Sequence, residues 1–244
     1  MKISIITCCK NSLPFLKETI NSVKKQNYKN FEHIFIVSKS SDNTSEYLKN
    51  LKYSKKKLFF FDKGNLYSCL NFGIKQAKGQ IIYILHSDDV LKKKIVFSKV
   101  VKSMKNIDFL FFNICISERN NTKKIIRKWN SSQIKNDHWL SVNLPAHTSL
   151  FIKKKIINKI GIYNQKYSIS ADFDYMIRLF KIKNIKYRFL NNTFLIMRTG
   201  GISSNFKYLP KRIKEDLKIL KSHYKNNYVT LYFLKILKKI LQLF

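Results

Sequence analysis

The sequence predicts an α/β fold, in which a mostly parallel central sheet is flanked by helices and followed by a C-terminal helical extension. Short apolar runs alternate with segments whose apolar residues recur every three or four positions, as expected for strands alternating with helices. Apolar residues make up 45% of the 244-residue chain, which is enough to cover both faces of such a sheet.

The first half of the chain predicts a regular series of strands and helices. Strands are expected at residues 3–8, 33–37, 58–61, 81–85 and 109–114. Helices are expected around residues 13–23, 48–51, 66–77 and 96–104. Ser12 is expected to cap the first of these helices, and Gly79 to end the third.

The second half is less regular. Residues 117–143 are polar and are expected to be rich in loops. Two short helices are expected, at 153–160, ended by Gly161, and at 171–182, and two strands follow at 187–190 and 194–197. Pro210 then opens a helix whose inward residues are expected to be Ile213, Leu217, Leu220 and Tyr224.

Residues 1–208 are therefore expected to form one domain, and residues 209–244 a C-terminal extension of basic amphipathic helices. In the last helix lysines lie mostly opposite an apolar face made of Leu234, Leu237, Leu241 and Phe244. Such a helix either lies in a membrane interface beside anionic lipids or packs on the domain.

Charge is the most unusual feature of the composition, because 48 Lys and Arg residues face 14 Asp and Glu residues, a net charge of +34. Such a field attracts anions of any kind, and a solvated surface that reflects biased composition is the alternative. Lysine far outnumbers arginine, which is the better reader of phosphates and bases, so no nucleic acid is expected as a partner.

The cysteines and the apolar runs bear on location. Cys8, Cys9, Cys69 and Cys115 show no paired metal-binding spacing and are expected to be reduced thiols of a cytoplasmic protein. Lys2 leads into a strand rather than into a signal peptide, and no run of about 18 apolar residues could span a membrane.

Asp88 and Asp89 are the first candidates for chemistry. They follow the fourth predicted strand, at the carboxyl edge of the sheet, where α/β folds bind ligands. Mg²⁺ and Mn²⁺ prefer carboxylate oxygen and often use one or two protein carboxylates together with substrate phosphates. The pair therefore suits a site for a nucleotide diphosphate. The alternative is that Ser87 or Asp88 caps the helix that follows.

Other polar motifs accompany this pair in a definite order along the chain. They are Thr7 with Asn11, Ser41-Asp42-Asn43-Thr44, Asp62-Lys63-Gly64, Asn71-Phe72-Gly73, Lys78-Gly79, His147 with Phe151, Gly161-Ile162-Tyr163, Ser170-Ala171-Asp172-Phe173-Asp174-Tyr175, Arg178-Leu179 and Gly200-Gly201-Ile202-Ser203-Ser204-Asn205. This order resembles the family 2 glycosyltransferases, which have the Rossmann-like GT-A fold, and most nearly their branch in bacterial surface-polysaccharide assembly. The resemblance covers roughly residues 2–205.

The resemblance implies a role for each matching residue. Thr7 and Asp62 would line the nucleotide base pocket, and Asn71 would lie on a helix beneath the diphosphate. Asp88 would lie near the ribose, and Asp89 would hold a divalent metal ion, Mn²⁺ or Mg²⁺.

On the acceptor side, the resemblance makes Asp172 the general base that takes the proton of the acceptor hydroxyl. The alternative for Asp172 and Asp174 is that acidic residues in the first turn complement the helix dipole. His147 would either shape the acceptor side or be a structural histidine.

The function implied is an inverting glycosyltransferase that moves a sugar from a nucleotide-sugar donor, expected to be a UDP-sugar, to a saccharide or lipid-linked acceptor. Its expected place is the inner face of the cytoplasmic membrane, in cell-surface polysaccharide synthesis. Two departures leave the donor nucleotide open: no acidic residue stands near Ser38, and Leu70 occupies a position where many members have arginine.

Two other functions remain as alternatives. A nucleotidyltransferase on a related sheet would carry a Gly-rich, basic loop after the first strand, where this chain has Cys8-Cys9-Lys10-Asn11. A basic protein that binds nucleic acid or membrane on a degenerate transferase fold would show no dependence on Asp89, and its binding would collapse with salt.

Overall fold

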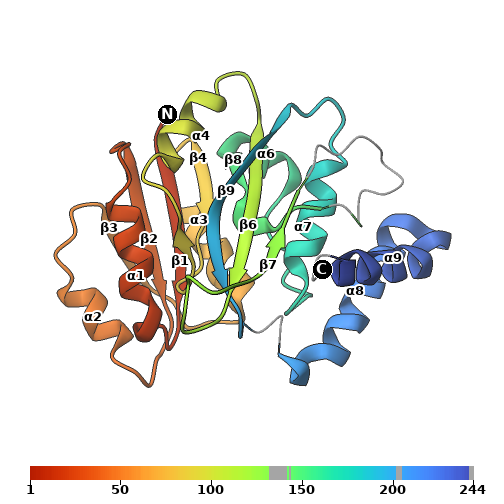
Figure 1. Ribbon diagram of the computed structural model, residues 1–244, viewed down its shortest axis with the longest axis horizontal. Helices are drawn as coiled ribbons and strands as arrows, with labels where there is room; N and C mark the ends of the chain where they lie inside the picture. Colours follow the sequence, from red (N-terminus) through yellow and green to blue (C-terminus); the bar gives the residue numbers. More distant parts are fainter. Residues whose placement is uncertain (132–141, 143, 202–204, 242–244) are drawn as a thin grey trace.

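One mixed sheet organises the chain, for which a computed structural model describes residues 1–131, 142, 144–201 and 205–241. The described strands are β1 (Ile3–Cys9), β2 (Phe31–Val37), β3 (Lys56–Phe60), β4 (Ile81–Ile84), β5 (Val90–Leu91), β6 (Phe109–Ser117), β7 (Ile125–Trp129), β8 (Phe151–Lys153) and β9 (Tyr187–Arg198). Their order across the sheet is β3-β2-β1-β4-β8-β6-β9-β5, and β7 pairs with β6 (Figure 1).

Strand direction decides where functional residues can gather. β1 is parallel to β2 and β4, β2 is parallel to β3, and β6 is parallel to β9. β8 is antiparallel to both β4 and β6, so β6 runs in the same direction as β4. Six strands therefore bring their carboxyl ends to one edge, and the predicted α/β fold with a mostly parallel sheet flanked by helices is confirmed.

Helices cover both faces of this sheet. They are α1 (Leu13–Lys24), α2 (Thr44–Asn50), α3 (Leu66–Gln76), α4 (Val96–Ser103), α6 (Lys154–Ile160), α7 (Ala171–Phe180), α8 (Leu209–Tyr224) and α9 (Tyr228–Leu241). The alternation of side chains along a strand assigns each apolar residue to a face. In β4, Ile81 and Tyr83 join the core beneath α4, whereas Ile82 and Ile84 join the core that includes α3, α6 and α7.

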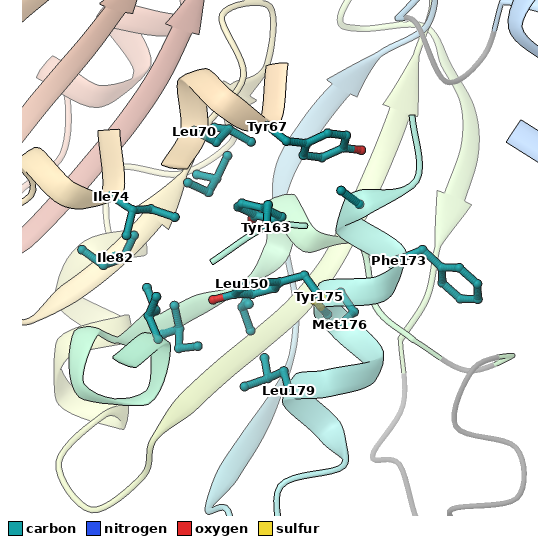
Figure 2. Close-up of a cluster of buried hydrophobic side chains, with 14 of the residues drawn as sticks. Tyr67, Leu70, Ile74, Ile82, Leu150, Tyr163, Phe173, Tyr175, Met176 and Leu179 are labelled. Carbon is teal, nitrogen blue, oxygen red and sulfur yellow. The ribbon is translucent and has the colours of Figure 1, made fainter. Parts of the chain in front are cut away.

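The second of these cores holds α7 in place. Figure 2 shows Tyr163 between the side chains of α3 and those of α7. The ring of Tyr163 stacks on that of Tyr175 at 4.5 Å between centroids, and Tyr67 lies 5.5 Å from Tyr163. Phe173, by contrast, points away from this cluster in the same view. α7 is thus fixed against the sheet on one side and presents Phe173 on another.

The two C-terminal helices pack on the same core, at the end of the sheet beside α7 (Figure 1). Ile219 and Leu220 of α8 are fully buried, and Leu231 of α9 is 6% exposed. The predicted inward position of Leu220 is thereby confirmed. The division of the chain between residues 208 and 209 stays a prediction, although both segments contribute to one hydrophobic core.

The face of α9 that is turned away from α8 is apolar and exposed. Phe233 is 66% exposed and Leu237 is 53% exposed, and Val229, Ile236 and Ile240 are also exposed at helical spacing on this face. Phe244, which we assigned to the apolar face of this helix, lies outside the described residues, as does the side chain of Leu241. None of the described helices is long and apolar enough to cross a membrane.

Several expected elements differ in the structure. Residues 117–143, expected to be loop, contain β7, which forms a hairpin with β6 because the edge of that longer strand supplies backbone partners. The two strands expected at 187–190 and 194–197 are one strand, β9, whose register shifts opposite Asn113. β5 and β8, two and three residues long, carry no periodicity that sequence reasoning could detect.

Of two expected helix caps, Ser12 has the expected position without a capping bond, and Gly79 does not end its helix. Ser12 occupies the N-cap position of α1, but in the described structure its hydroxyl makes no capping bond and instead accepts from the backbone N–H of Lys10 at 3.1 Å. α3 ends at Gln76 with an extended Ala77, so Gly79 lies beyond the helix. Gly161 does end α6, with a φ of +78° that favours glycine.

Gly79 is required for a close approach of two backbones rather than for a turn. A Cβ at this position would lie 2.7 Å from the backbone nitrogen of Ser4 and 2.9 Å from the carbonyl carbon of Ile3. Backbone atoms in a central strand cannot move aside without displacing β1.

We therefore expect Gly79→Ala to lower the free energy of unfolding by about 1–3 kcal/mol, the usual range for overpacking a well-packed interior. Urea denaturation followed by circular dichroism would measure the change. Gly201→Ala is the matched control, because a Cβ there meets no described atom within 4 Å. Equal stability of the two variants would contradict the proposed contact.

Candidate active site

The carboxyl edge of the sheet gathers the polar residues that follow its parallel strands. Asp88 and Asp89 follow β4, Arg119 follows β6, and Arg198 ends β9. α4 begins only at Val96, with Ile95 as its N-cap residue, so neither Ser87 nor Asp88 caps a following helix as the structural alternative required. The aspartate pair is therefore free of that role.

Asp89 is a buried carboxylate without a hydrogen-bond partner. Its residue is 1% exposed, and neither side-chain oxygen has a partner among the described residues. Burial raises the pKa of Asp89 well above its ordinary value, and the neighbouring charge of Asp88 raises it further, while Arg198 acts in the opposite direction. A buried carboxylate of this kind requires a positive charge to remain ionised.

Two arginines lie beside Asp88 and supply positive charge to this edge. The guanidinium of Arg198 is buried and donates to the backbone carbonyl of Asp88 and to the carboxylate of Glu18. Arg119 lies 3.5 Å from the carboxylate of Asp88 and donates to the carbonyl of Thr199 at 3.0 Å. Such guanidinium groups are well suited to bind phosphate oxygens.

These residues fit a divalent cation that is shared with a substrate. No cluster of three or more His, Cys, Asp or Glu side chains with metal-binding geometry occurs in the described ranges, so these ranges contain no complete cage of protein ligands. Asp89 nevertheless offers two unpartnered oxygens beside Asp88. Mg²⁺ and Mn²⁺ bound with nucleotides commonly use one or two carboxylates and take their remaining ligands from phosphates and water.

Two of the residues expected around the nucleotide, Asp62 and Thr7, lie after β3 and in β1 and differ in their exposure to solvent. Asp62 is exposed after β3, and its carboxylate accepts from the backbone N–H of Lys39 at 3.2 Å. Thr7 is fully buried in β1, and its hydroxyl lies 3.0 Å from Nε2 of His33, whose pKa burial lowers to about 3. The ring of His33 is therefore neutral at physiological pH.

Asn71 has a structural contact that the sequence did not predict. Its amide donates to the carbonyl of Tyr163 at 2.8 Å, and its oxygen accepts from the N–H of Tyr163 at 2.9 Å. The pair of bonds ties α3 to the turn after α6. The donor-binding roles of Thr7, Asp62 and Asn71 stay predictions, as do those of Asp88 and Asp89.

Asp172 lies in the first turn of α7 and is held on both carboxylate oxygens. Tyr67 donates to Oδ1 at 2.9 Å, and Nδ1 of His147 lies 3.0 Å from Oδ2. Burial alone would raise the pKa of Asp172, but the hydrogen bonds and charge of His147, followed by Tyr67, outweigh it and lower that pKa to about 2. The side chain is still 33% exposed, so a ligand can reach it.

A second histidine extends this arrangement toward the aspartate pair. Nε2 of His86 lies 3.1 Å from Nε2 of His147, and burial lowers the pKa of His86 to about 4. Nδ1 of His147 can donate to Asp172, and of the two Nε2 atoms one donates to the other, in a direction set by the tautomer or charge of each ring. The chain His86–His147–Asp172 thus connects the end of β4 to the start of α7.

Asp174, the other acidic residue of the first turn, has structural partners in the described part of the chain. It pairs with Arg178 of its own helix at 2.9 Å and with His223 of α8 at 3.0 Å. Of the two carboxylates in this turn, only Asp172 is connected to the carboxyl edge of the sheet.

Comparison of the sequence with known families assigns the chain to one of them. The family model described as glycosyl transferase family 2 matches residues 4–161. The chain belongs to this family. Among curated relatives, an uncharacterized glycosyltransferase of Rickettsia conorii is 28% identical over 198 residues, which is 76% of this chain and 32% of the relative. An uncharacterized glycosyltransferase of Methanocaldococcus jannaschii is 27% identical over 221 residues, 87% of this chain and 75% of the relative.

Solved structures with the same fold are more distant in sequence. S. aureus TarS 1–349 in complex with UDP has a TM-score of 0.64 at 16% identity, covering 91% of this chain and 64% of that one. The mannosyltransferase PcManGT from Pyrobaculum calidifontis, in complex with GDP-Man and Mn²⁺, has a TM-score of 0.61 at 12% identity, covering 89% of this chain and 61% of that one. The chain thus spans about a third of the Rickettsia relative and under two thirds of these structures.

Sequence reasoning named the candidate site residues but missed the residues that contact them. Tyr67, His86, Arg119 and Arg198 each act across 30 or more residues of sequence. The one available signal was position: His86 directly precedes Ser87 and the aspartate pair, at the carboxyl edge where polar residues are expected. Residues 202–204 of the glycine-containing motif at 200–205 lie outside the described residues.

We expect His147→Ala to raise the pKa of Asp172 from about 2 toward or above its ordinary 3.8, because the strongest contact favouring the carboxylate is lost while burial remains. Carbon-13 NMR titration of labelled aspartates would measure it. Asp174 is the internal control, since its partners are unchanged.

The sign of the pH effect follows from the same shift. Because the folded-state pKa of Asp172 lies below 3.8, its contacts stabilise the fold above that pH, and this stabilisation is lost as the pH falls toward 2. An Asp172 pKa unchanged by His147→Ala would show that the 3.0 Å contact has no electrostatic effect.

Proposed function

We propose that this chain is an inverting glycosyltransferase that uses a nucleotide-sugar donor, with a UDP-sugar as the expected donor. The observation that carries the proposal is the chain of contacts from the end of β4, through His86 and His147, to Asp172. This chain of contacts links Asp88 and Asp89, which suit a nucleotide diphosphate, with Asp172, which suits an acceptor hydroxyl. TarS has been solved with UDP-GlcNAc, which supports a UDP-sugar.

On the donor side, Arg119 and Arg198 would bind and orient the nucleotide diphosphate, and Asp88 would lie near the ribose. Asp89 would hold the divalent cation, which when bound neutralises the negative charge that develops on the leaving nucleoside diphosphate. Arg198 is already fixed by Glu18 and the carbonyl of Asp88, so its charge is oriented before a ligand arrives.

On the acceptor side, Asp172 would take the proton of the acceptor hydroxyl. At the same time the oxygen of that hydroxyl bonds to the anomeric carbon of the sugar, and the bond from that carbon to the diphosphate breaks. Both oxygens of Asp172 are already hydrogen-bonded, and each retains a lone pair for that proton. With a pKa of about 2, the group is ionised at neutral pH but is a weak base. Proton transfer is therefore expected to accompany formation of the glycosidic bond rather than precede it.

The acceptor is proposed to be a saccharide or lipid-linked saccharide of cell-surface polysaccharide synthesis, reached by peripheral contact with the inner face of the cytoplasmic membrane. The support is the exposed apolar face of α9 on a chain of net charge +34. Cationic amphipathic helices of this kind bind anionic lipid surfaces.

The central test is a donor screen with UDP-, GDP- and dTDP-sugars, with and without Mn²⁺, on the wild type and on Asp172→Asn and Asp89→Asn. We expect Asp172→Asn to lower turnover by roughly 10²–10⁴-fold while UDP binding is retained, as for loss of a general base. We expect Asp89→Asn to remove the dependence on Mn²⁺ together with the activity.

Asp108→Asn is the matched control, because Asp108 lies at the amino edge of the sheet, where it accepts from the N–H of Lys186 at 3.1 Å. It should keep wild-type turnover. Normal turnover by Asp172→Asn would exclude that residue as the base, and Mn²⁺-dependent activity in Asp89→Asn would exclude the proposed metal ligand.

Liposome flotation tests the membrane contact. We expect the wild type to float with vesicles rich in anionic lipid, and the double variant Phe233→Ser/Leu237→Ser to stay in solution, because both side chains are exposed. Phe60→Ser, which removes a 57% exposed side chain from β3, is the matched control. Equal flotation of all three proteins would contradict a role for this face.

A further inference from the structure

A carboxylate from the C-terminal extension is buried beneath the start of α7. Glu215 of α8 is 8% exposed, and its two oxygens accept four hydrogen bonds from one short segment. Oε1 accepts from the N–H of Ser168 at 3.0 Å and from its hydroxyl at 3.1 Å. Oε2 accepts from the N–H groups of Ile169 and Ser170, both at 2.9 Å.

The segment that Glu215 holds leads directly to the proposed base. Ser170 is the N-cap residue of α7, and Asp172 is the second residue of that helix. The carbonyl of Ile169 accepts from the hydroxyl of Tyr67 at 2.6 Å, and that hydroxyl also contacts Asp172. Glu215 therefore fixes residues 168–170 by accepting from their three consecutive N–H groups. The carbonyl of Ile169 in this segment and the carboxylate of Asp172 share the hydroxyl of Tyr67.

Ordinary capping does not explain these contacts. The hydroxyl of Ser170, in the N-cap position, makes no capping bond in the described structure. The N–H groups that Glu215 accepts belong to residues 168–170, before the helix, whereas a cap accepts from the first N–H groups within it. Glu215 thus orders the approach to the helix, which sets the position of its first turn.

The same extension touches α7 at two further points. Asp174 pairs with His223 of α8 at 3.0 Å. Lys235 of α9 lies 3.3 Å from the ring centroid of Phe173 and 2.9 Å from Asp216. Residues before and after Asp172 in the sequence are thus held by α8 and α9.

The electrostatics agree with this geometry. Burial alone would raise the pKa of Glu215, but the hydrogen bonds from residues 168–170 outweigh it and lower that pKa below its ordinary value. The group is therefore ionised at neutral pH, and an amide in its place would put an NH₂ group against N–H donors.

We propose that Glu215 is a positioning residue for the general base, so that the C-terminal helices form part of the catalytic architecture. This inference rests on the proposed function. Glu215 itself touches neither donor nor acceptor, and acts by holding residues 168–170 and, through them, the carboxylate of Asp172.

The test compares Glu215→Gln with Glu32→Gln in the full chain. Glu32 is also a buried carboxylate, and it accepts from Ser4, Lys2 and the N–H of Lys78, but it lies at the amino edge of the sheet. We expect Glu215→Gln to lower kcat by roughly 10–100-fold, since a displacement of about 1 Å has that effect. The donor KM and the Kd for UDP should be unchanged. Glu32→Gln should lose stability but keep kcat.

Hydrogen exchange provides a readout that does not need turnover. The amides of residues 168–170 should exchange faster in Glu215→Gln and at the wild-type rate in Glu32→Gln. If Glu215→Gln does not fold, Ser168→Ala removes one of the four bonds and should give a smaller fall in kcat with unchanged UDP binding.

A kcat loss in Glu215→Gln no larger than in Glu32→Gln, or a loss accompanied by equally weakened UDP binding, would overturn the inference. A wild type without turnover on any donor would instead overturn the proposed function. In that case faster exchange in Glu215→Gln would still establish the structural contact, and unchanged exchange would exclude it.

Discussion

The common direction of six strands is the constraint on which the candidate site depends. β1, β2, β3, β4, β6 and β9 all end at one edge, so segments separated by more than 100 residues meet there. β8 makes this possible, because it is antiparallel to both β4 and β6. The parallel strands β1 to β4 and the parallel pair β6 and β9 therefore point in the same direction. The pairing of β5, just after Asp89, with β9 then holds Arg198 beside Asp88.

The placement of acidic residues is the second feature that organises the molecule. With 14 acidic residues against 48 basic ones, a carboxylate in this chain is scarce. Several are buried and hydrogen-bonded where they connect elements: Glu32 joins β1 and β2 to the turn before β4, and Glu215 joins α8 to the start of α7. Asp89 is buried without a hydrogen-bond partner among the residues that the structure describes, which makes it a candidate ligand for a cation. The proposed function accordingly depends on a few acidic residues.

The C-terminal helices connect the two proposals. Their inner side holds α7 through Glu215, His223 and Lys235, and their outer side presents the apolar face of α9. A membrane bound to the apolar face of α9 would be separated by this one helix from the residues that position the proposed base. In a chain that transfers sugar to a lipid-linked acceptor, this arrangement would bring the acceptor and the base to the same end of the sheet.

The sequence by itself determined the α/β class and the series of strands in the first half, and its resemblance to a family supplied the candidate site residues. Periodicity and composition are local properties, and so is the position of Asp88 and Asp89 after an apolar strand or of Asp172 in a first helical turn. These could be predicted because each depends on neighbours within about ten residues. The helix cap assigned to Gly79 failed for the opposite reason, since its requirement comes from β1, 75 residues away.

Only the tertiary structure decided how these residues act on one another. The pairing of His86 with His147 spans 61 residues, and the contact of Tyr67 with Asp172 spans 105. The short strands β5 and β8 exist because neighbouring strands supply their hydrogen bonds, not because of any propensity in two or three residues. Hydrogen bonds and ion pairs between distant segments leave no periodic trace, so the sequence identified the proposed base, and the fold decided which groups hold it.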